Sequence, residues 1–391
     1  MNHSICIATS TRADWGLLKP LATALRQNPT IRLQILATNM HLLPRYGHTI
    51  DEITADGFTV DATVAMDDSA DDSPQARAEA MAQCLAGTAR ELARLQPDAL
   101  VILGDRYEML AVASAATLLR VPIIHIAGGE ITLGAIDDSI RHAITKLASL
   151  HLTATEPYRR RVIQMGEAPE RVICTGAIGV WNVFQQPFPT EAELRNELNI
   201  SSEGDLAVVT YHPATCDDAD PTERFAALLA ALDRFPQLHC IITCPNNDPR
   251  SMGIIELIER YAEAHPQRVT AIKSLGMRRY LAAITAAKVV IGNSSSGLVE
   301  VPSAGTPTVD IGIRQAGRLA GESVIHCDEG TDAIAAAIER ALSPQMQALA
   351  GRRVNPYAKA NTLEIMEKAV LNFVASLPHK PKQFYDIDFT C

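Results

Sequence analysis

The sequence predicts an α/β protein with two doubly wound parallel sheets that face each other across a cleft. Short apolar, β-branched runs bounded by Gly, Asn, Asp or Pro alternate with longer segments whose apolar residues recur every three or four positions. That alternation is typical of repeated βα units with right-handed crossovers. Because 391 residues exceed what one hydrophobic core usually serves, we expect two Rossmann-like domains.

The strand runs fall into two series separated by an interruption. The first series runs through SICIAT, RLQILAT, ALVILG, PIIHIAG, LHLTAT and RVICTG, and the second through LAVVTYHP, HCIITCPN, VTAIKS, VVIGNSSSG, TPTVDIG and SVIHC. Between them, FQQPFPTEAELRNELNISSEG combines two prolines with a polar helix. We therefore expect one domain at 1–183 and a second at 184–360. Fold analogy suggests that a helix in 361–391 packs back on the first domain.

Composition and charge exclude several classes of partner. A formal charge of −10 opposes binding to nucleic acid or an anionic membrane, so a phosphate-bearing ligand must be held by local groups. No apolar run approaches the roughly 20 residues that span a bilayer. The N-terminus enters a strand pattern at once, so we expect a cytoplasmic protein.

The cysteines do not have the spacing of a metal or redox site, and several fall within apolar strands. We expect buried, reduced thiols and no structural metal. The eight are Cys6, Cys84, Cys174, Cys216, Cys240, Cys244, Cys327 and Cys391.

Polar residues that directly follow the strands are the first candidates for a site, because ligands bind at the carboxyl ends of an open parallel sheet. After the first strand, Arg12 and Gly16 open a helix where N–H groups and a guanidinium could meet a phosphate. A surface arginine near a helix cap is the alternative. After the second strand, His41 either faces the crevice or has a structural role.

Charged residues gather after the strands ALVIL and PIIHI. A charged pair after an apolar strand is costly unless it faces the cleft or is internally paired, so a catalytic carboxylate and a structural ion pair both fit. In the segment after PIIHI, two glycines permit a close approach of the backbone. Helix capping would explain Asp137 but not the other charged residues of this segment. The charged candidates are Asp105, Arg106, Glu130, Asp137, Arg141 and His142.

The second half contains the clearest anion-binding pattern, VVIGNSSSGLVE. The strand passes through Ser294, Ser295, Ser296 and Gly297 into a short helix, so free N–H groups and hydroxyls can point at a diphosphate. The pattern is neither GxGxxG nor a P-loop motif, and a merely polar turn is the alternative. Glu300 could accept hydrogen bonds from a ribose. The other candidates after strands of this half are His212, Asn246 and Arg314.

With these residues assembled, the chain resembles the UDP-N-acetylglucosamine 2-epimerases, in particular the hydrolysing branch used in sialic acid and related nonulosonic acid synthesis. The motifs TRADWG, LGDRYE, GGE, DDSIRHAITKL, TYHP and GNSSSGLVEVPS carry the resemblance along nearly the whole chain. It implies a glycosyltransferase-B-like fold, a UDP held mainly by the second domain, and a homodimer or homotetramer. Many members have a carboxylate where this chain has Ala127, so Glu130 is our candidate for the base.

The resemblance also implies roles for the site residues. Asp105, Glu130, Asp137 and His212 would be catalytic, while the serine segment, Glu300 and the other polar residues named above would bind the substrate. The implied reaction removes the C2 proton and releases UDP from C1 to give 2-acetamidoglucal, to which water adds. UDP-N-acetylglucosamine would then yield N-acetylmannosamine and UDP.

Several alternatives stay open beside this reaction. The sugar could be a UDP-linked 2,4-diacetamido-2,4,6-trideoxyglucose, or UDP could return in a non-hydrolysing epimerisation. A glycosyltransferase and a nucleotide-sugar sensor are further alternatives, although clustered carboxylates argue against a sensor. Because the leaving diphosphate is already stabilised, we expect neither a cofactor nor a metal, and activity that survives EDTA.

Overall fold

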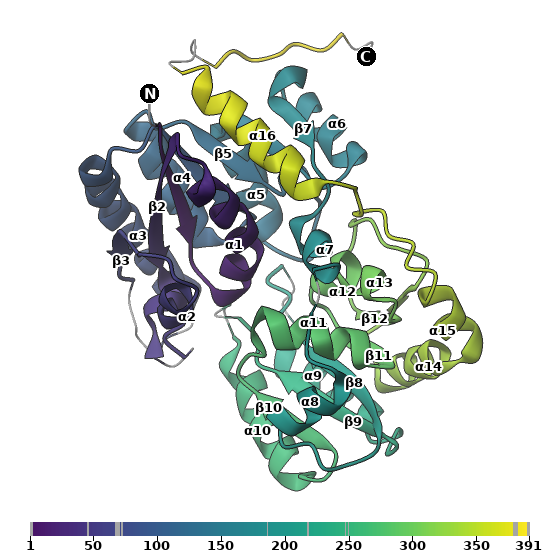
Figure 1. The fold of residues 1–391 in the computed structure, drawn as a ribbon. Coiled ribbons are helices and arrows are strands. Elements are labelled where there is room, and N and C mark those ends of the chain that lie inside the picture. The colour runs from purple at the N-terminus through teal and green to yellow at the C-terminus, as the bar shows by residue number, and fades with distance from the viewer. Residues whose placement is uncertain are drawn as a thin grey trace.

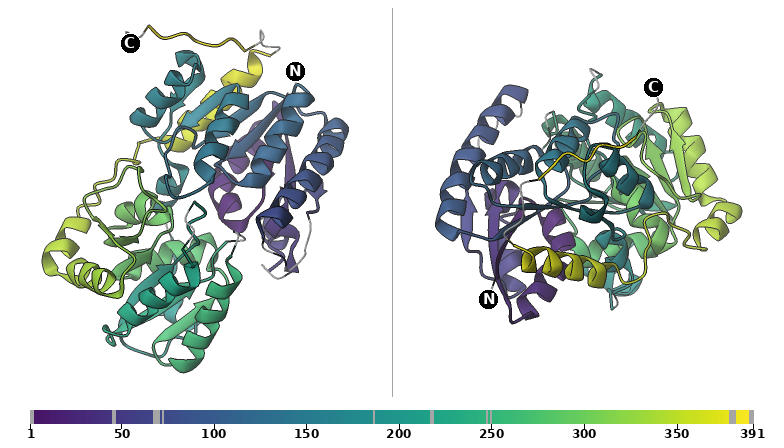
Figure 2. Two further views of the ribbon diagram at one scale, coloured as in Figure 1. Left: turned by 180° about the vertical axis from the view of Figure 1, so that it is seen from behind. Right: turned by 90° about the horizontal axis from the view of Figure 1, so that it is seen from above.

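The computed structural model describes residues 3–44, 47–66, 71, 73–185, 187–216, 219–246, 248, 250–377 and 382–388. Its strands form two parallel sheets with helices on both faces, as Figure 1 and Figure 2 show, which confirms the predicted fold class. The amino-terminal sheet and the helices among its strands run from purple to teal in Figure 1, and the second sheet with its helices runs from teal to yellow-green.

The first sheet contains seven strands in the order β3-β2-β1-β4-β5-β6-β7. They are β1 (His3–Thr9), β2 (Ile31–Thr38), β3 (Ala62–Val64), β4 (Ala99–Leu103), β5 (Ile123–Ile126), β6 (Leu150–Thr153) and β7 (Val172–Cys174). The helical segments among them are α1 (Arg12–Gln27), η1 (Asn39–Leu42), α2 (Ile50–Ala55), α3 (Pro74–Leu95), α4 (Tyr107–Leu118), α5 (Asp137–Leu147), α6 (Glu156–Gln164), η3 (Pro169–Arg171) and α7 (Ile178–Val183).

The second sheet has six strands in the order β10-β9-β8-β11-β12-β13. They are β8 (Asp205–Thr210), β9 (Leu238–Thr243), β10 (Val269–Ile272), β11 (Val289–Gly292), β12 (Thr308–Ile311) and β13 (Val324–Cys327). The remaining helices are α8 (Glu191–Glu197), α9 (Pro221–Leu232), α10 (Met252–Ala264), α11 (Gly276–Ala286), α12 (Ser296–Val299), α13 (Val301–Ala304), α14 (Thr331–Leu342), α15 (Pro344–Ala350) and α16 (Thr362–Ala375).

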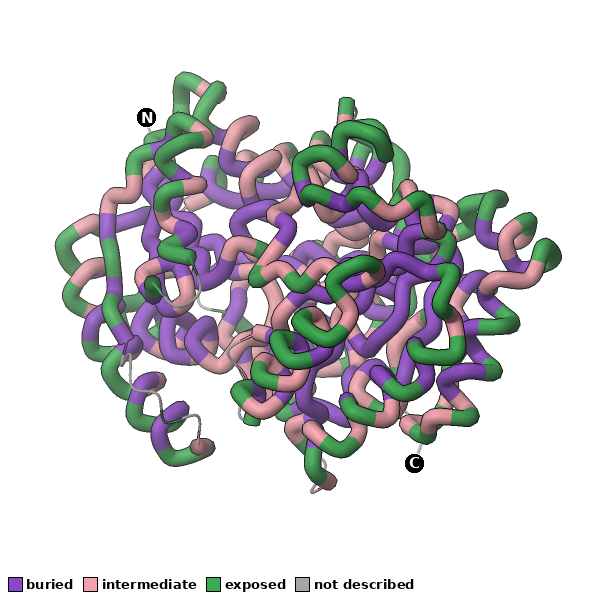
Figure 3. The backbone as a smooth tube through the Cα atoms, turned by 90° about the horizontal axis from the view of Figure 1, so that it is seen from below, coloured by how far each residue is buried: buried purple, intermediate pink, exposed green. Residues whose placement is uncertain are grey.

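Both faces of each sheet are buried, which is why the strands are continuous apolar runs. In β1, Ile5 and Ile7 join the core beneath α1 and α16, whereas Cys6 and Ala8 join the core beneath α3 and α4. The second sheet has the same arrangement, with one core facing α9, α10 and α14 and the other facing α11. Figure 3 shows buried stretches of the chain in the interior and exposed stretches around the outside.

Helix α16 returns from the second sheet to the first. Its residues Met366, Val370 and Phe373 lie in the core formed with α1, and the helix also packs against α7 (Figure 1). The division at 183 and 184 stays our proposal for the domain boundary, with α16 counted with the first sheet. Within the described residues, no helix has the length and apolar character needed to cross a membrane.

The expectation of buried thiols is wrong for Cys216. Its side chain is exposed, and the residue lies in a turn after β8, where its backbone N–H donates to Gly134 O at 3.2 Å. Cys6, Cys84 and Cys240 are buried, and Cys391 lies outside the described residues.

Candidate active site

A cavity of about 610 Å³ lies between the two sheets, at the carboxyl ends of their strands. Most residues that the sequence indicated for a site line it: Arg12, Gly16, Asp105, Arg106, Glu130, Asp137, His212, Asn246, Ser294, Ser295, Ser296, Glu300 and Arg314. Four others do not line it, namely His41, Arg141, His142 and Gly297.

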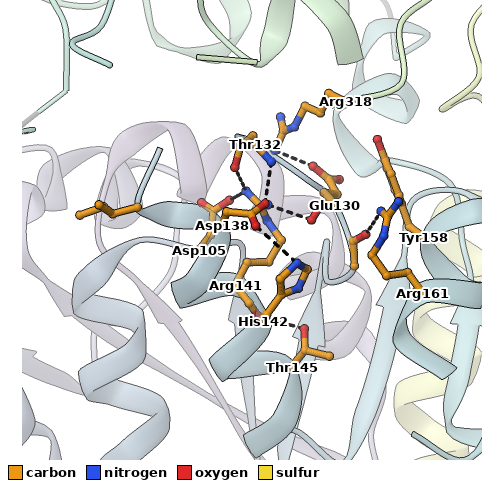
Figure 4. A network of polar contacts seen from close by, with 12 residues as sticks. Asp105, Glu130, Thr132, Asp138, Arg141, His142, Thr145, Tyr158, Arg161 and Arg318 are labelled. Atoms are coloured by element: carbon orange, nitrogen blue, oxygen red, sulfur yellow. Dashed lines mark hydrogen bonds and ion pairs between the residues drawn. The ribbon is translucent and has the colours of Figure 1, made fainter. Parts of the chain in front are cut away.

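Asp105 enters the cavity from the turn after β4, and Arg141 of α5 holds it there. The Arg141 side chain is only 1% exposed and donates to the Asp105 carboxylate. It also donates to Glu130 O at 3.0 Å and to Thr132 Oγ1 at 3.1 Å (Figure 4). The two terminal nitrogens of Arg141 are used in these bonds, and its side chain does not line the cavity. Arg141 therefore supports Asp105. A direct contact with substrate is not supported by this placement.

Asp105 and Asp137 have pKa values displaced in opposite directions. Burial opposes ionisation of Asp105, but the nearby charges of Arg141, Arg318 and Arg314 hold its pKa below the usual range. Burial, and after it the charge of Asp105, raises the pKa of Asp137 to about 6. Such a pair provides one permanently ionised carboxylate and one that exchanges a proton near neutral pH, the arrangement used in acid–base catalysis.

Glu130 is engaged in an ion pair that the sequence did not predict. Its Oε2 lies 2.6 Å from Arg318 Nη2, and both side chains are less than a tenth exposed. Burial opposes the charge of Arg318, but the nearby carboxylates of Glu130 and Asp105, together with two tyrosines, raise its pKa above the usual value. Glu130 therefore lines the cavity as the ion-pair partner of Arg318, which follows strand β12 of the other sheet.

His212 follows β8, and its hydrogen bonds fix which nitrogen of the ring has the proton. The backbone N–H of Asn246 donates to His212 Nδ1 at 3.2 Å, so the neutral ring has its proton on Nε2. Burial, and then the charges of Arg314 and Arg106, lower the pKa of His212, which keeps the ring neutral. The Asn293 side chain fixes the turn through bonds of 2.7 Å and 2.8 Å to the His212 backbone N–H and carbonyl. A donor fixed in this way suits an oxyanion.

The serine segment lies across the cavity from these carboxylates. Tyr280 OH donates to Ser296 Oγ at 2.6 Å, and Arg314 Nη1 donates to Asn293 O at 3.2 Å, which fixes both ends of the segment. Arg314 Nε is buried and has no protein partner among the described residues. Burial raises the pKa of Glu300 to about 7, so its carboxyl group can donate as well as accept a hydrogen bond at neutral pH.

Two of the predicted glycines have packing roles. A Cβ on Gly16 in α1 would lie 3.1 Å from Met277 Cβ of α11, so this glycine lets helices from the two halves approach. A Cβ on Gly297 would lie 2.8 Å from Thr308 Cγ2. The predicted roles in phosphate binding therefore lack support from the positions of these two residues, although Gly16 does lie at the cavity wall.

Two of the predicted histidines lie away from the cavity. His41 is fully buried, with Nε2 2.9 Å from Thr9 Oγ1 and Nδ1 2.8 Å from Thr49 Oγ1. His142 has its Nε2 3.6 Å from Asp138 Oδ2 on the same helix. Both placements favour the structural alternative, because the ring nitrogens of His41 are used inside its domain and His142 does not reach the cavity.

The sequence analysis also missed several polar residues of the cavity wall. Asp14 lies there because Thr11 and Asp14 form the capping box that begins α1. The TRADWG motif contained that signal, but only Arg12 and Gly16 were chosen from it. Arg318 similarly follows Arg314 by one helical turn's spacing in IRQAGR. Among the residues missed are Asp14, Asp248, Lys273, Tyr280 and Arg318.

Comparison with known proteins identifies the group to which this site corresponds. A family model described as UDP-N-acetylglucosamine 2-epimerase matches residues 23–370. A GDP/UDP-N,N'-diacetylbacillosamine 2-epimerase (hydrolyzing) of Campylobacter jejuni is 36% identical over 323 residues, which are 83% of this chain and 84% of that protein. The polysialic acid biosynthesis protein P7 of Escherichia coli is 36% identical over 384 residues, 98% of this chain and 97% of that protein.

A solved structure shares the fold at low sequence identity. The UDP-GlcNAc 2-epimerase of Neisseria meningitidis, in a crystal structure bound to UDP-GlcNAc, superposes with a TM-score of 0.75. The two chains are 15% identical, and the match covers 94% of this chain and 100% of that one. The similarity extends over both sheets and therefore over both walls of the cavity.

Proposed function

The chain belongs to the UDP-N-acetylglucosamine 2-epimerase family and is a UDP-sugar 2-epimerase, and from this premise we propose that it hydrolyses its substrate. It converts UDP-N-acetylglucosamine and water to N-acetylmannosamine and UDP. The observation that carries the proposal is the pairing of Asp105 with Asp137 on one wall of the cavity, with the serine segment and Arg314 on the other. Proton abstraction and diphosphate departure need these two kinds of group.

In the first half-reaction a base removes the proton at C2. Ionised Asp137 takes this proton, the electron pair of the C–H bond forms the C1–C2 double bond, and the C1–O bond breaks with its electrons passing to UDP. Arg314 and the donors of Ser294–Ser296 stabilise the diphosphate that leaves. Asp105 stays ionised beside Arg141 and keeps the pKa of Asp137 high enough for a useful base near neutral pH.

In the second half-reaction water adds to the 2-acetamidoglucal. The water oxygen bonds to C1, and C2 receives a proton on the face opposite to the one that lost it, so that C2 is inverted. Neutral His212, with its proton on Nε2, is a candidate donor in this step or to the departing diphosphate. Atoms balance as UDP-sugar plus water giving the C2-inverted sugar plus UDP.

The pH dependence of turnover follows from the pKa of Asp137. The raised pKa of about 6 means that the ionised base is lost as pH falls through 6. We expect kcat to rise with pH along an acidic limb centred near pH 6 and to be level above pH 7. Stopped assays of UDP release from pH 4.5 to 8.5 measure this. A limb centred near pH 4 would contradict the assignment of Asp137 as base.

A second substrate is supported by the names of two relatives, one of Campylobacter jejuni and one of Legionella pneumophila. The Campylobacter jejuni relative is named for N,N'-diacetylbacillosamine, so a UDP-linked 2,4-diacetamido-2,4,6-trideoxy sugar is the alternative to UDP-N-acetylglucosamine. The reacting atoms C1 and C2 are the same in both sugars. A relative of Neisseria meningitidis named UDP-N-acetylglucosamine 2-epimerase, 33% identical over 88% of this chain, supports UDP-N-acetylglucosamine as the first choice.

The decisive experiment incubates the protein with each sugar nucleotide and follows the products by NMR. Stoichiometric free UDP and a free C2-inverted sugar support hydrolysis. Accumulation of the UDP-linked epimer without free UDP would contradict hydrolysis and support a non-hydrolysing epimerisation. The sugar with the higher kcat/KM identifies the substrate. Assembly as a homodimer or homotetramer stays a prediction, which multi-angle light scattering would test.

A further inference from the structure

A fully buried histidine outside the cavity connects the elements that carry both carboxylates. His125 lies in β5 with no exposed surface. Its Nε2 is 2.7 Å from Gly104 O, and its Nδ1 is 3.2 Å from Thr145 Oγ1. Gly104 precedes Asp105, and Thr145 lies on α5, which begins at Asp137. One imidazole ring therefore joins two elements of the site.

The contact with Gly104 fixes the turn that presents Asp105. Gly104 has a φ of 75°, and its N–H donates to Ile126 O at 3.0 Å. Its carbonyl can only accept, so His125 Nε2 has the proton and donates it. This backbone conformation favours glycine. It is held by the His125 hydrogen bond to the Gly104 carbonyl and by the Gly104 N–H bond to Ile126 O.

The contact with Thr145 reaches the helix of Asp137. Thr145 Oγ1 is also 2.9 Å from Arg141 O, and Arg141 is the residue that pairs with Asp105. Because the His125 proton is on Nε2, Nδ1 can only accept, so the single hydroxyl proton of Thr145 is shared between His125 Nδ1 and Arg141 O. A Cβ on Gly128 would lie 3.0 Å from His125 Nδ1 and 2.9 Å from Thr145 Oγ1, so the GGE turn closes directly over this contact.

The ring introduces no charge near the carboxylates. Burial is the largest cause that lowers the pKa of His125 to about 4, against the opposing effects of the Gly104 bond and the Asp105 charge. At neutral pH the histidine is therefore an uncharged spacer with one donor and one acceptor. Its effect on Asp105 and Asp137 comes from geometry.

We propose that His125 is a positioning residue that sets the separation of Asp105 and Asp137 by joining the Gly104 turn to α5 through Thr145. This inference rests on the proposed function, because it assigns His125 to that reaction. The ring does not line the cavity and touches no substrate. Its loss should lower the rate of the chemical step and leave the nucleotide site, on the other wall, intact.

The test compares His125→Phe, which removes both hydrogen bonds, with His125→Gln, which keeps a donor in reach of Gly104 O. We expect His125→Phe to lower kcat about 100-fold, the cost of displacing a catalytic group by about 1 Å, with KM and the Kd for UDP within about twofold of wild type. We expect kcat of His125→Gln to be at least tenfold higher than kcat of His125→Phe.

Thr145→Val removes the other end of the contact and should lower kcat about tenfold. This variant tests the positioning role if His125→Phe does not fold.

The matched control is His151→Gln. His151 is equally buried and is paired with His125 in register across β5 and β6, but its Nε2 binds Glu167, away from the Asp105 turn. This variant loses a comparable buried bond, and we expect its kcat within about twofold of wild type. An equal loss of kcat in His151→Gln would overturn the proposal, because general destabilisation would then explain both results.

The pH profile separates positioning from stability. Asp137 is faced by Asp105, Asp248, Arg106 and Arg314, of which Asp105 contributes most to raising its pKa after burial. If His125→Phe lets the carboxylates move apart, the acidic limb of kcat shifts to lower pH by about half a unit or more. Unchanged kcat and an unchanged limb in His125→Phe would overturn the inference. Absence of turnover in the wild-type protein with every UDP-sugar would instead overturn the proposed function.

Discussion

Replacement of Asp137 by asparagine is expected to lower kcat about 10³-fold while UDP binds with unchanged affinity. The amide cannot take the C2 proton, and general-base catalysis contributes roughly 10²- to 10⁴-fold to rates. The proposed diphosphate donors lie on the second sheet, and among the described residues no hydrogen bond or ion pair joins them to this side chain, although the charge of Arg314 faces it. UDP release under saturating substrate gives kcat, and isothermal titration gives the Kd for UDP.

Two comparisons make the Asp137 result specific. Asp138 is next to it on α5, but it accepts from the Thr132 N–H at 2.6 Å and does not line the cavity. We therefore expect kcat of Asp138→Asn to stay within about threefold of wild type.

Asp137→Asn should also be more stable than wild type at pH 7. The folded protein holds this proton up to about pH 6 while the unfolded chain releases it near pH 4, so ionisation destabilises the fold above that range.

A calorimetric series checks the sign of this stability difference. The excess Tm of Asp137→Asn over wild type should develop between pH 4 and pH 6 and persist at higher pH. If the variant is less stable than wild type at pH 7, or if it retains turnover, then Asp137 is not the buried base that we describe.

The largest effect on stability is expected for Arg141→Met. Removal of one partner of a buried ion pair typically costs about 3–5 kcal/mol, because the other charge stays buried without compensation. Here that charge is Asp105, whose side chain is 22% exposed and still faces Arg318 and Arg314, so we expect a cost at the lower end of this range. Glu130 O and Thr132 Oγ1 lose a donor at the same time (Figure 4). Turnover should be lost as well. Urea unfolding measures the stability.

A double variant separates the charge from the fold. Asp105→Asn combined with Arg141→Met removes both charges, so we expect it to recover more than half of the lost unfolding free energy. Turnover should stay absent, because Asp105 is then missing from the site. Exposed Arg160→Met on α6 is the matched control and should change stability by less than about 0.5 kcal/mol. Equal destabilisation by the single and double variants would show that Asp105 is not ionised in the fold.

The sheets and the location of the site could be predicted because both depend on local patterns. Apolar runs of four to eight residues identify buried strands, and the residues after each run lie at one edge by the geometry of parallel sheets. Asp105, Ser294 and Arg314 were found in this way, and the cavity contains all three.

The contacts that the sequence did not predict join distant segments. Arg141 and Asp137 are one turn apart on α5, yet one is paired inside the domain and the other lies at the cavity. Gly16 matches a phosphate-binding glycine by its position, but its open face meets Met277 of the second half. The Arg318 to Glu130 pair and the bonds of His125 likewise join residues from different elements, which periodicity and spacing do not report.

The most direct test of the central claim uses isotopically labelled water. The claim is that carboxylates of the first sheet remove the C2 proton of a UDP-sugar while donors of the second sheet release UDP by breaking the C1–O bond. In D₂O enriched in H₂¹⁸O, the account predicts deuterium at C2 of the freed sugar and no ¹⁸O in the released UDP. Retained hydrogen at C2, or ¹⁸O in the β-phosphate of UDP, would contradict it.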